Sequence, residues 1–209
     1  MRGTSAEVKK MNKFSKTQRL VGTAILFALV IVLQTFSSII KPGLVPITLA
    51  LIPIIVGAVM YGASTGAFLG FAFSVIVLIA VLTGADPVHN AFFAIKPVPI
   101  VLVCLLKGTL AGFLAGLVAS KLSKTNLSLS VIAAAIITPV CNTGVYALCM
   151  MLFFKDELMA DYGNAAGYTN VFLFIMVAWI GFNFFIELII DVVLSPVVIR
   201  IINTLRHSS

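Results

Sequence analysis

The sequence predicts an all-α membrane protein, a bundle of six transmembrane helices with cytosolic N- and C-termini. Three observations support this fold: an apolar composition, six long apolar runs, and basic residues gathered on one side of them. Of the 209 residues, 61% are hydrophobic and 10% charged, whereas a soluble domain carries about 25% charged residues. The composition therefore excludes a soluble enzyme, a disordered chain, a coiled coil and a disulfide-stapled secreted domain.

Six runs are long enough to cross a bilayer, which needs about 20 apolar residues per helix. Because backbone in lipid must satisfy its own hydrogen bonds, we expect each run to be helical. The residues before and after them form a basic cytosolic segment (1–17) and a cytosolic tail (204–209), flanking one domain (18–203). The predicted spans are 18–40, 44–61, 63–83, 97–119, 127–154 and 170–203.

The boundaries between the runs are marked by polar residues, glycine and proline. Lys41-Pro42-Gly43 ends the first run, and Tyr61-Gly62 separates the second from the third. A longer loop begins at Thr83-Gly84-Ala85-Asp86-Pro87 and ends at Lys96-Pro97. Polar loops at 121–128 and 155–169 separate the remaining spans. The loops after the third and fifth spans are the longest, and long loops often carry function.

The basic residues set the orientation, because cytosolic flanks of membrane spans are enriched in Lys and Arg. An outer location is expected for Lys41, Lys96 and Lys155, while Lys107 lies within a span. Since the remaining basic residues crowd the ends of spans and not a solvated face, no nucleic-acid partner is expected. The ten inner residues are Arg2, Lys9, Lys10, Lys13, Lys16, Arg19, Lys121, Lys124, Arg200 and Arg206.

No motif for covalent chemistry or nucleotide binding occurs, so we expect neither an enzyme nor a bound cofactor or metal. The three cysteines, Cys104, Cys141 and Cys149, lie inside apolar runs and are interpreted as small apolar residues. Both histidines, His89 and His207, lie outside the predicted membrane core.

Ionisable side chains inside a span are costly and indicate function. Three occur, Lys107, Glu187 and Asp191, and the last two share a helical stripe with Asn183 at i, i+4 and i+8. Lys107 allows three interpretations: a structural ion pair with Glu187, an anchor for an anionic group of a ligand, or a lysine that extends along the wall toward the interface.

Other polar and small residues give weaker signals. The proline in Thr138-Pro139 predicts either a kink satisfied by neighbouring helices or, through Asn142, a contact to a polar ligand. His89 and Asn90, followed by Phe92 and Phe93, suit a lid over a small molecule or an interfacial belt. Glycines at four-residue spacing predict close packing between helices, and they are Gly66, Gly70, Gly108, Gly112 and Gly116.

Several motifs, in this order on six spans, resemble one transporter family. They are Ala24-x-x-x-Ala28, Leu44-Val45-Pro46-Ile47-Thr48-Leu49-Ala50-Leu51-Ile52-Pro53 with Gly57, Gly66-Ala67-Phe68-Leu69-Gly70, Leu105-Leu106-Lys107-Gly108 with Gly112, and Pro139-x-x-Asn142-Thr143-Gly144. Together they resemble the substrate-binding (S) component of energy-coupling factor (ECF) vitamin transporters, and the match looks closest to pantothenate-type members. The resemblance covers about residues 18–203.

The resemblance implies a multi-pass protein of a bacterial cell membrane that binds a water-soluble vitamin in a cavity open to the outside. It implies docking on a membrane coupling subunit attached to two ATPase subunits, followed by toppling in the lipid to deliver the vitamin. The coupling subunit would meet Ala24 and Ala28. The substrate-binding residues would be Asn90, Lys107, Asn142, Tyr146 and Asn183.

Pantothenate agrees with the residue types, because Lys107 and Lys96 could neutralise a carboxylate while Asn142 and Asn183 suit an amide and hydroxyls. Folate, hydroxymethylpyrimidine and riboflavin remain alternatives, although the single tryptophan, Trp179, offers little stacking for a flavin. Two other classes stay open. One is an ion-coupled secondary carrier that uses Glu187 or Asp191, and the other is a scaffold whose intramembrane charges only assemble a complex.

Overall fold

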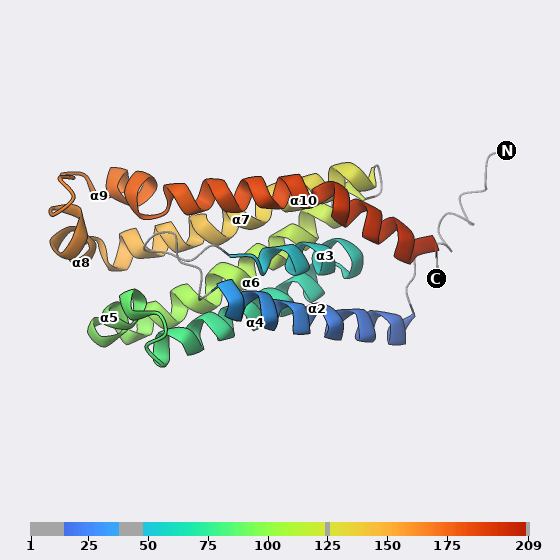
Figure 1. Cartoon of the computed structure of the whole chain (residues 1–209), viewed down its shortest axis with the longest axis horizontal. Helices are drawn as coiled ribbons and strands as arrows, with labels where there is room; N and C mark the ends of the chain where they lie inside the picture. Colours follow the sequence, from blue (N-terminus) through green and yellow to red (C-terminus); the bar gives the residue numbers. More distant parts are fainter. Residues whose placement is uncertain (1–14, 38–47, 124–125, 208–209) are drawn as a thin grey trace.

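The computed structural model describes residues 15–37, 48–123 and 126–207, and all regular structure in these residues is helical. The long helices run side by side and form an elongated bundle (Figure 1). Four of them are long and apolar enough to cross a membrane, and they confirm the predicted spans 63–83, 97–119 and 127–154. They also confirm 18–40 as far as Ser37, and residues 38–40 lie outside the described residues. The four helices are α2 (Lys16–Ser37), α4 (Ala63–Leu82), α6 (Pro97–Leu122) and α7 (Leu127–Phe153).

The predicted span 170–203 is broken, so the expectation of one continuous helix is wrong. It consists of α9 (Val171–Leu173), the π-helix η2 (Phe174–Trp179) and α10 (Gly181–His207). The segment before the break, Val171–Trp179, and the helix after it, Gly181–Leu205, meet at an angle of 48°. The N–H of Ile180 donates to the carbonyl of Ile175, five residues back, which is the π pattern that often marks functional breaks in helices. Counted as one bent span, this segment brings the total to five among the described residues.

The predicted span 44–61 is helical, in its described part, only over α3 (Leu51–Tyr61). Its 11 residues extend about 16 Å at 1.5 Å per residue, which is less than the roughly 30 Å of a bilayer core. Residues 48–50 form a turn, and the start of the predicted span lies outside the described residues. The six-span count is therefore not reached in the described part of the chain.

The loop predicted after the third span contains a helix, α5 (Pro87–Ile95). Its start is well specified: Pro87 occupies the first turn, and the Asp86 carboxylate accepts the backbone N–H of His89 at 3.3 Å. The short elements α8 (Lys155–Leu158) and η1 (Met159–Gly163) lie at the same end of the bundle as α5 (Figure 1). At the opposite end α2 begins and α10 finishes.

Helices α4 and α6 touch through their backbones. A Cβ atom on Gly66 would meet the carbonyl oxygen of Gly112, and one on Gly70 would meet that of Gly108. This confirms the predicted role of the glycine stripes, which allow close helix approach inside the bundle. Helices α4 and α6 are therefore tightly packed against each other, and α5 lies in the connection between them.

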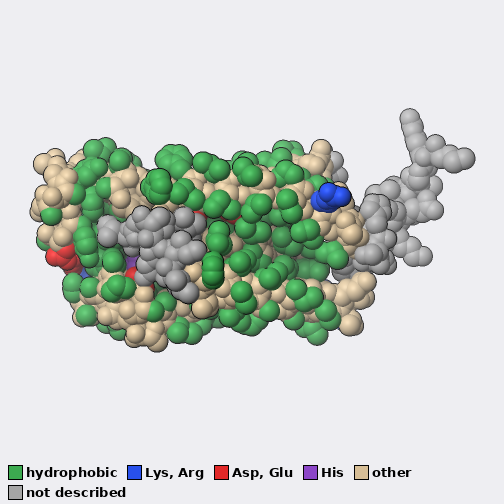
Figure 2. Space-filling model, in the orientation of Figure 1, with side chains coloured by type: hydrophobic (Ala, Val, Ile, Leu, Met, Phe, Trp, Pro, Cys, Tyr) green, Lys and Arg blue, Asp and Glu red, His purple; other side chains and the backbone are tan. Residues whose placement is uncertain are grey.

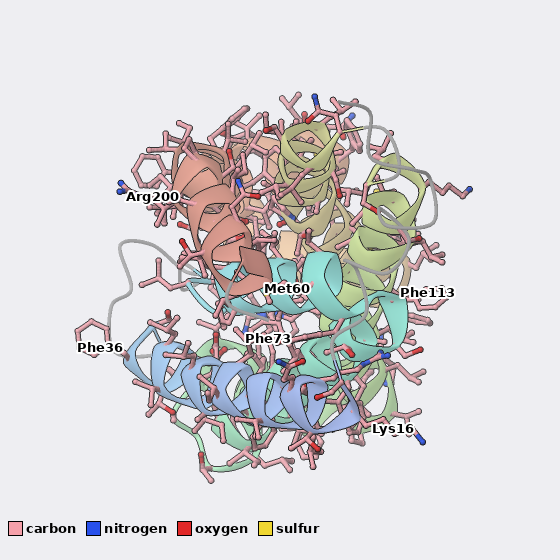
Figure 3. All side chains as sticks on the ribbon, turned by 90° about the vertical axis from the view of Figure 1, so that its right-hand side faces the viewer. Lys16, Phe36, Met60, Phe73, Phe113 and Arg200 are labelled. Atoms are coloured by element: carbon pink, nitrogen blue, oxygen red, sulfur yellow. The ribbon has the colours of Figure 1, made fainter. Side chains whose placement is uncertain are left out.

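The surface of the bundle is apolar, as expected in lipid. Figure 2 shows apolar side chains over most of the visible face, a basic side chain near the end where α10 finishes, and acidic ones toward the end with α5 and α8. The view onto the end where α2 begins labels Lys16 and Arg200 (Figure 3). Beneath this surface, one apolar core joins α3, α4, α7 and α10, and a second, rich in aromatic residues, lies under α5, α8 and η2.

Candidate functional site

A partly enclosed cavity lies within the bundle, between α4, α5, α6, α7 and α10. Its volume is about 50 Å³, which is room for only a few water molecules. Since pockets for small organic ligands measure roughly 300–1,000 Å³, the cavity must widen before it can hold a vitamin. Polar and ionisable side chains nevertheless gather in its wall: Gln34, Thr48, Asp86, His89, Lys107, Asn142, Thr143, Tyr146, Asn183 and Glu187.

Most of the substrate-binding residues predicted from the sequence meet at this cavity. Lys107, Asn142, Tyr146 and Asn183 line it, although they come from three different helices. Asn90 does not line it among the described residues. Its Nδ2 donates to the Val81 carbonyl at 2.9 Å and so holds α5 against α4.

Lys107 is a half-buried cation that lies against aromatic rings. Its Nζ is 5.2 Å from the ring centroid of Tyr146 and 5.8 Å from that of Phe73, a geometry that stabilises an ammonium group weakly. Within residues 15–37, 48–123 and 126–207 this nitrogen has no ion pair and no hydrogen bond. The predicted structural pair with Glu187 is therefore absent from the structure.

Glu187 has a different partner. Its Oε1 accepts the backbone N–H of Thr48 at 2.7 Å, which ties α10 to the residues just before α3. The side chain is 5% exposed and lines the same cavity as Lys107. A basic and an acidic side chain thus share the cavity wall without forming an ion pair with each other.

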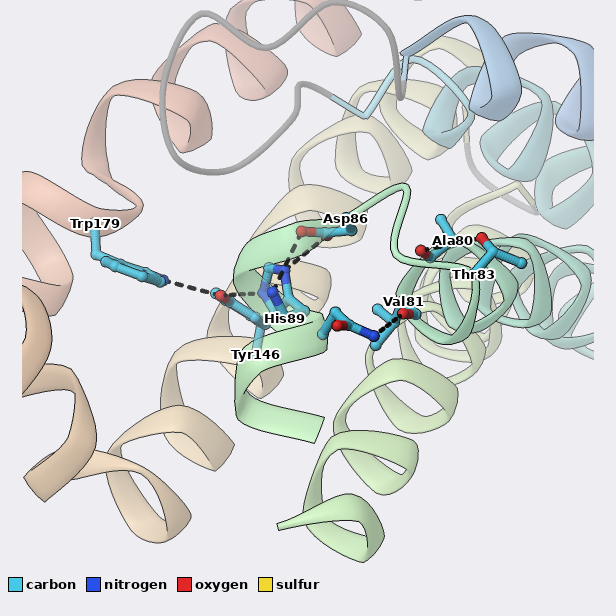
Figure 4. A network of polar contacts seen from close by, with 8 residues as sticks. Ala80, Val81, Thr83, Asp86, His89, Tyr146 and Trp179 are labelled. Atoms are coloured by element: carbon cyan, nitrogen blue, oxygen red, sulfur yellow. Dashed lines mark hydrogen bonds and ion pairs between the residues drawn. The ribbon is translucent and has the colours of Figure 1, made fainter. Parts of the chain in front are cut away.

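A chain of hydrogen bonds joins residues of the cavity wall to Trp179 (Figure 4). The Nδ1 of His89 lies 2.7 Å from Asp86 Oδ2, and its Nε2 lies 2.7 Å from the Tyr146 hydroxyl. That hydroxyl also accepts the indole N–H of Trp179 at 2.9 Å. All four side chains are buried. The chain joins α5, α7 and the end of η2, the element that precedes the break in the last span.

The donors and acceptors of this chain are all satisfied by one arrangement of protons. Neutral His89 with its proton on Nδ1 donates to Asp86 and accepts from the Tyr146 hydroxyl, which in turn accepts from Trp179. Because its hydroxyl is engaged in this way, Tyr146 offers the cavity the face of its ring, over which Lys107 lies.

Asn142 lies where the helix α7 passes the cavity. It is 4% exposed, and its Oδ1 has no hydrogen-bond partner among the described residues. A buried carbonyl without a donor costs about 1–3 kcal/mol. The predicted kink at Pro139 does not interrupt α7, which continues from Leu127 to Phe153. The unsatisfied oxygen in the cavity wall therefore needs a donor from outside the described protein residues.

The predicted binding set lacks six polar or ionisable residues of the cavity wall: Gln34, Thr48, Asp86, His89, Thr143 and Glu187. The sequence could have indicated Asp86 and His89, because Asp86-Pro87 is a helix N-terminal signal that places His89 in the first turn of α5. Glu187 was noted as a costly intramembrane charge but was assigned to pairing or proton exchange.

The predicted partner surface, Ala24 and Ala28, lies on an exposed face of α2. The buried residues of that helix, which include Leu26 and Val30, lie on a different face. A separate apolar groove of about 670 Å³ runs between α2, α3 and α10. The side of the bundle that carries α2 is therefore apolar and has small residues at its surface.

At the end of α5, Lys96 contacts the segment that follows α7. Its Nζ lies 2.7 Å from Glu157 Oε1 and donates to the Phe153 carbonyl at 2.7 Å. Two hydrogen bonds hold the pKa of the Glu157 carboxyl below its ordinary value of 4.5. The larger effect comes from the Lys96 ammonium and the smaller from the backbone N–H of Glu157 itself. Lys96, which the sequence suggested for a ligand carboxylate, is thus occupied by a protein carboxylate.

Metal-binding groups do not gather in the described part of the chain. There, no three side chains of His, Cys, Asp or Glu come close enough to hold an ion. Cys104, Cys141 and Cys149 are free thiols.

The comparison with known families agrees with this arrangement of apolar helices around a polar cavity. Residues 18–199 match the family described as ECF transporter, substrate-specific component. No curated protein matches the chain. The match begins within α2, ends within α10 and includes every cavity residue named above. The chain therefore belongs to the family of substrate-specific components of ECF transporters.

Proposed function

We propose that this protein is the membrane-embedded binding subunit for uptake of a water-soluble vitamin, with pantothenate as the favoured substrate. Substrate-specific components of ECF transporters are transport subunits and not enzymes; they bind a small molecule and work with an ECF module. The proposed partners are accordingly one coupling membrane subunit, two ATPase subunits and the surrounding membrane lipid.

The observation that carries the proposal is an unpaired cation beside an unpaired acceptor in one cavity. Lys107 has no carboxylate partner among the described residues, and Asn142 Oδ1 has no donor there. A charge held inside a membrane bundle indicates a functional partner. Pantothenate offers a carboxylate for the lysine and an amide N–H and hydroxyls for the carbonyl oxygen.

The direct test is mass spectrometry of small molecules released from the purified protein, followed by calorimetric titration with pantothenate. Lys107→Ala should lower the affinity at least tenfold, about 1.4 kcal/mol, and leave thermal stability nearly unchanged. If the affinity is unchanged while the protein loses stability, Lys107 has a structural role and the proposal is wrong.

An aromatic vitamin is the second candidate, and rings in the cavity wall favour it. Phe73, Tyr146 and Phe184 line the cavity, and the Trp179 indole lies directly behind Tyr146. Such rings suit hydroxymethylpyrimidine or riboflavin, while folate combines a ring system with carboxylates. The mass of the released ligand separates these candidates from pantothenate.

An ion-coupled carrier is a less favoured alternative, supported by the burial of Glu187 and Asp191 on α10. Such a carrier would move its substrate in vesicles that hold an ion gradient but no ATP. ATP-dependent uptake that requires the coupling and ATPase subunits would exclude it.

We further propose six spans with both termini in the cytosol. In support, α2 begins and α10 finishes at one end of the bundle, where Lys16 and Arg200 lie (Figures 1 and 3). Asp86 and Glu157 belong to elements at the opposite end. Reporter fusions to the C-terminus and to the α7–α9 connection should respond on opposite sides of the membrane; equal responses would contradict this topology.

A further inference from the structure

The wall of the cavity has two chemically different poles. Lys107 is a donor with no hydrogen-bond or ion-pair partner in the described residues, and it lies over the rings of Tyr146 and Phe73. Glu187 and the Oδ1 of Asn142 are acceptors in the same wall. If these side chains had only a structural role, Lys107 and Glu187 would be expected to form an ion pair, because each ionised group is costly to bury alone.

Glu187 is also incompletely satisfied. A carboxylate can accept about four hydrogen bonds, whereas the hydrogen bonds from described residues to Glu187 come from Thr48, through its backbone N–H at 2.7 Å and its hydroxyl. Those bonds fix the orientation of the group without neutralising its charge. The side chain is 5% exposed and lines the cavity, so a molecule in the cavity can supply the remaining donors.

We infer that Glu187 is a substrate-binding residue that determines specificity, accepting hydrogen bonds from hydroxyl or amine groups of the ligand while Lys107 receives its anionic group. This inference rests on the proposed function and adds the orientation of the substrate in the cavity. The substrate is a molecule with an anion at one end and hydrogen-bond donors at the other. In pantothenate, the carboxylate lies toward Lys107, the two hydroxyls lie toward Glu187, and the amide N–H is available to Asn142.

A purely structural role for Glu187 is the competing explanation, since its bond to Thr48 joins two helices. Glu187→Gln separates the two roles, because the amide oxygen of glutamine still accepts the Thr48 N–H while the negative charge is removed. Asp191→Asn is the matched control. Asp191 is one turn further along α10 and 4% exposed, but it does not line the cavity among the described residues.

Three probes, titrated calorimetrically into the purified full-length protein, locate the two poles. They are pantothenate, pantothenol, in which a CH2OH group replaces the carboxylate, and N-(3,3-dimethylbutanoyl)-β-alanine, which lacks both hydroxyls. Glu187→Gln should weaken pantothenate about tenfold or more but leave the analogue without hydroxyls within about twofold. Lys107→Met should weaken pantothenate similarly and pantothenol little, and Asp191→Asn should change none of the three by more than about twofold.

The outcomes distinguish this inference from the function on which it rests. If the wild-type protein binds no pantothenate, the favoured function fails and the inference fails with it. If pantothenate binds but Glu187→Gln weakens it and the analogue without hydroxyls equally, or weakens neither, Glu187 does not contact the hydroxyls and the inference alone is overturned. If Glu187→Gln weakens pantothenate less than the analogue without hydroxyls, Glu187 does not bind the hydroxyl end of the substrate, and the inference is also overturned.

Discussion

The Nε2 of His89 lies 2.7 Å from the Tyr146 hydroxyl, and this contact links α5 to α7 in the wall of the cavity. On its other side, α5 is held to α4 through Asn90 and Val81. Because α4 and α6 are in backbone contact, α5 is expected to remain with them when the cavity widens. Widening should therefore separate α5 from α7, and two polar contacts would have to break: His89–Tyr146 and the bond from Lys96, at the end of α5, to the Phe153 carbonyl.

Tyr146→Phe should destabilise the protein by about 1–3 kcal/mol. The substitution leaves two buried groups, His89 Nε2 and the Trp179 indole N–H, without their present partner. Thermal unfolding of the purified protein measures the effect. Tyr168→Phe is the matched control, because the Tyr168 hydroxyl has no hydrogen bond within the described residues. Equal stability of the two variants would show that the chain through Tyr146 contributes nothing.

Asn142→Leu should have opposite effects on the empty and the loaded protein. Removing a buried, unpaired carbonyl should stabilise the ligand-free protein by about 1 kcal/mol. The same change removes an acceptor for the ligand, so the rise in melting temperature on adding pantothenate should disappear. Melting curves with and without the vitamin test both effects. A destabilised empty protein would mean that the Asn142 oxygen is satisfied in solution.

Gly112→Ala should destabilise the bundle by about 1–3 kcal/mol, because the added methyl group would meet the Gly66 carbonyl and force α4 and α6 apart. Gly144→Ala is the control: on α7 a Cβ meets nothing within 4 Å, and alanine favours the helix by about 0.5–1 kcal/mol. Unfolding in a denaturant series should therefore give opposite signs for the two variants. A stable Gly112→Ala protein would contradict the tight α4–α6 contact.

The Lys96–Glu157 pair should make a small pH-dependent contribution to stability. Since Lys96 holds the pKa of Glu157 below 4.5, the stabilisation is complete above that value and is lost as the pH falls through the lower folded-state pKa. At pH 7 Glu157→Gln should cost at most about 1 kcal/mol, because both side chains are partly exposed. The difference in melting temperature from wild type should shrink as the pH falls below 4.5.

Asp156→Asn is the control for that series. Asp156 is the exposed neighbour of Glu157 and forms no ion pair with a described residue. Its substitution should cost less stability at pH 7 than Glu157→Gln, because no ion pair is lost. A Glu157→Gln effect that persists unchanged at low pH would show that the lost contact is not the charge pair.

Helix existence could be predicted from the sequence far better than helix continuity. Runs such as 63–83 and 97–119 are apolar throughout, and hydrophobic length alone identifies them. The break at Ile180–Gly181 could not be predicted from hydropathy, because η2 is as apolar as its neighbours. The helix α5 could have been predicted, since Asp86 and Pro87 form an N-terminal signal that was interpreted only as a loop.

The candidate site could be predicted in residue types but not in pairings. Lys107, Asn142 and Asn183 were found because polar groups in apolar spans are costly, and they do line one cavity. A structural pair of Lys107 with Glu187 was one of three interpretations of the intramembrane charges. The sequence does not determine how each helix is rotated about its axis, and in the structure Glu187 accepts from Thr48 while Lys107 lies on aromatic rings.

Ala28→Trp should block transport without affecting substrate binding. Ala28 is exposed on α2, away from the cavity, so a large side chain there is accommodated by the isolated subunit but prevents close approach of another helix. Vitamin affinity of the purified subunit should stay within about twofold, while ATP-dependent uptake in cells that contain the coupling and ATPase subunits should be lost. Leu110→Trp, at an exposed position of α6, is the matched control and should leave uptake intact. Normal uptake by the Ala28→Trp protein would mean that the coupling subunit docks on another surface.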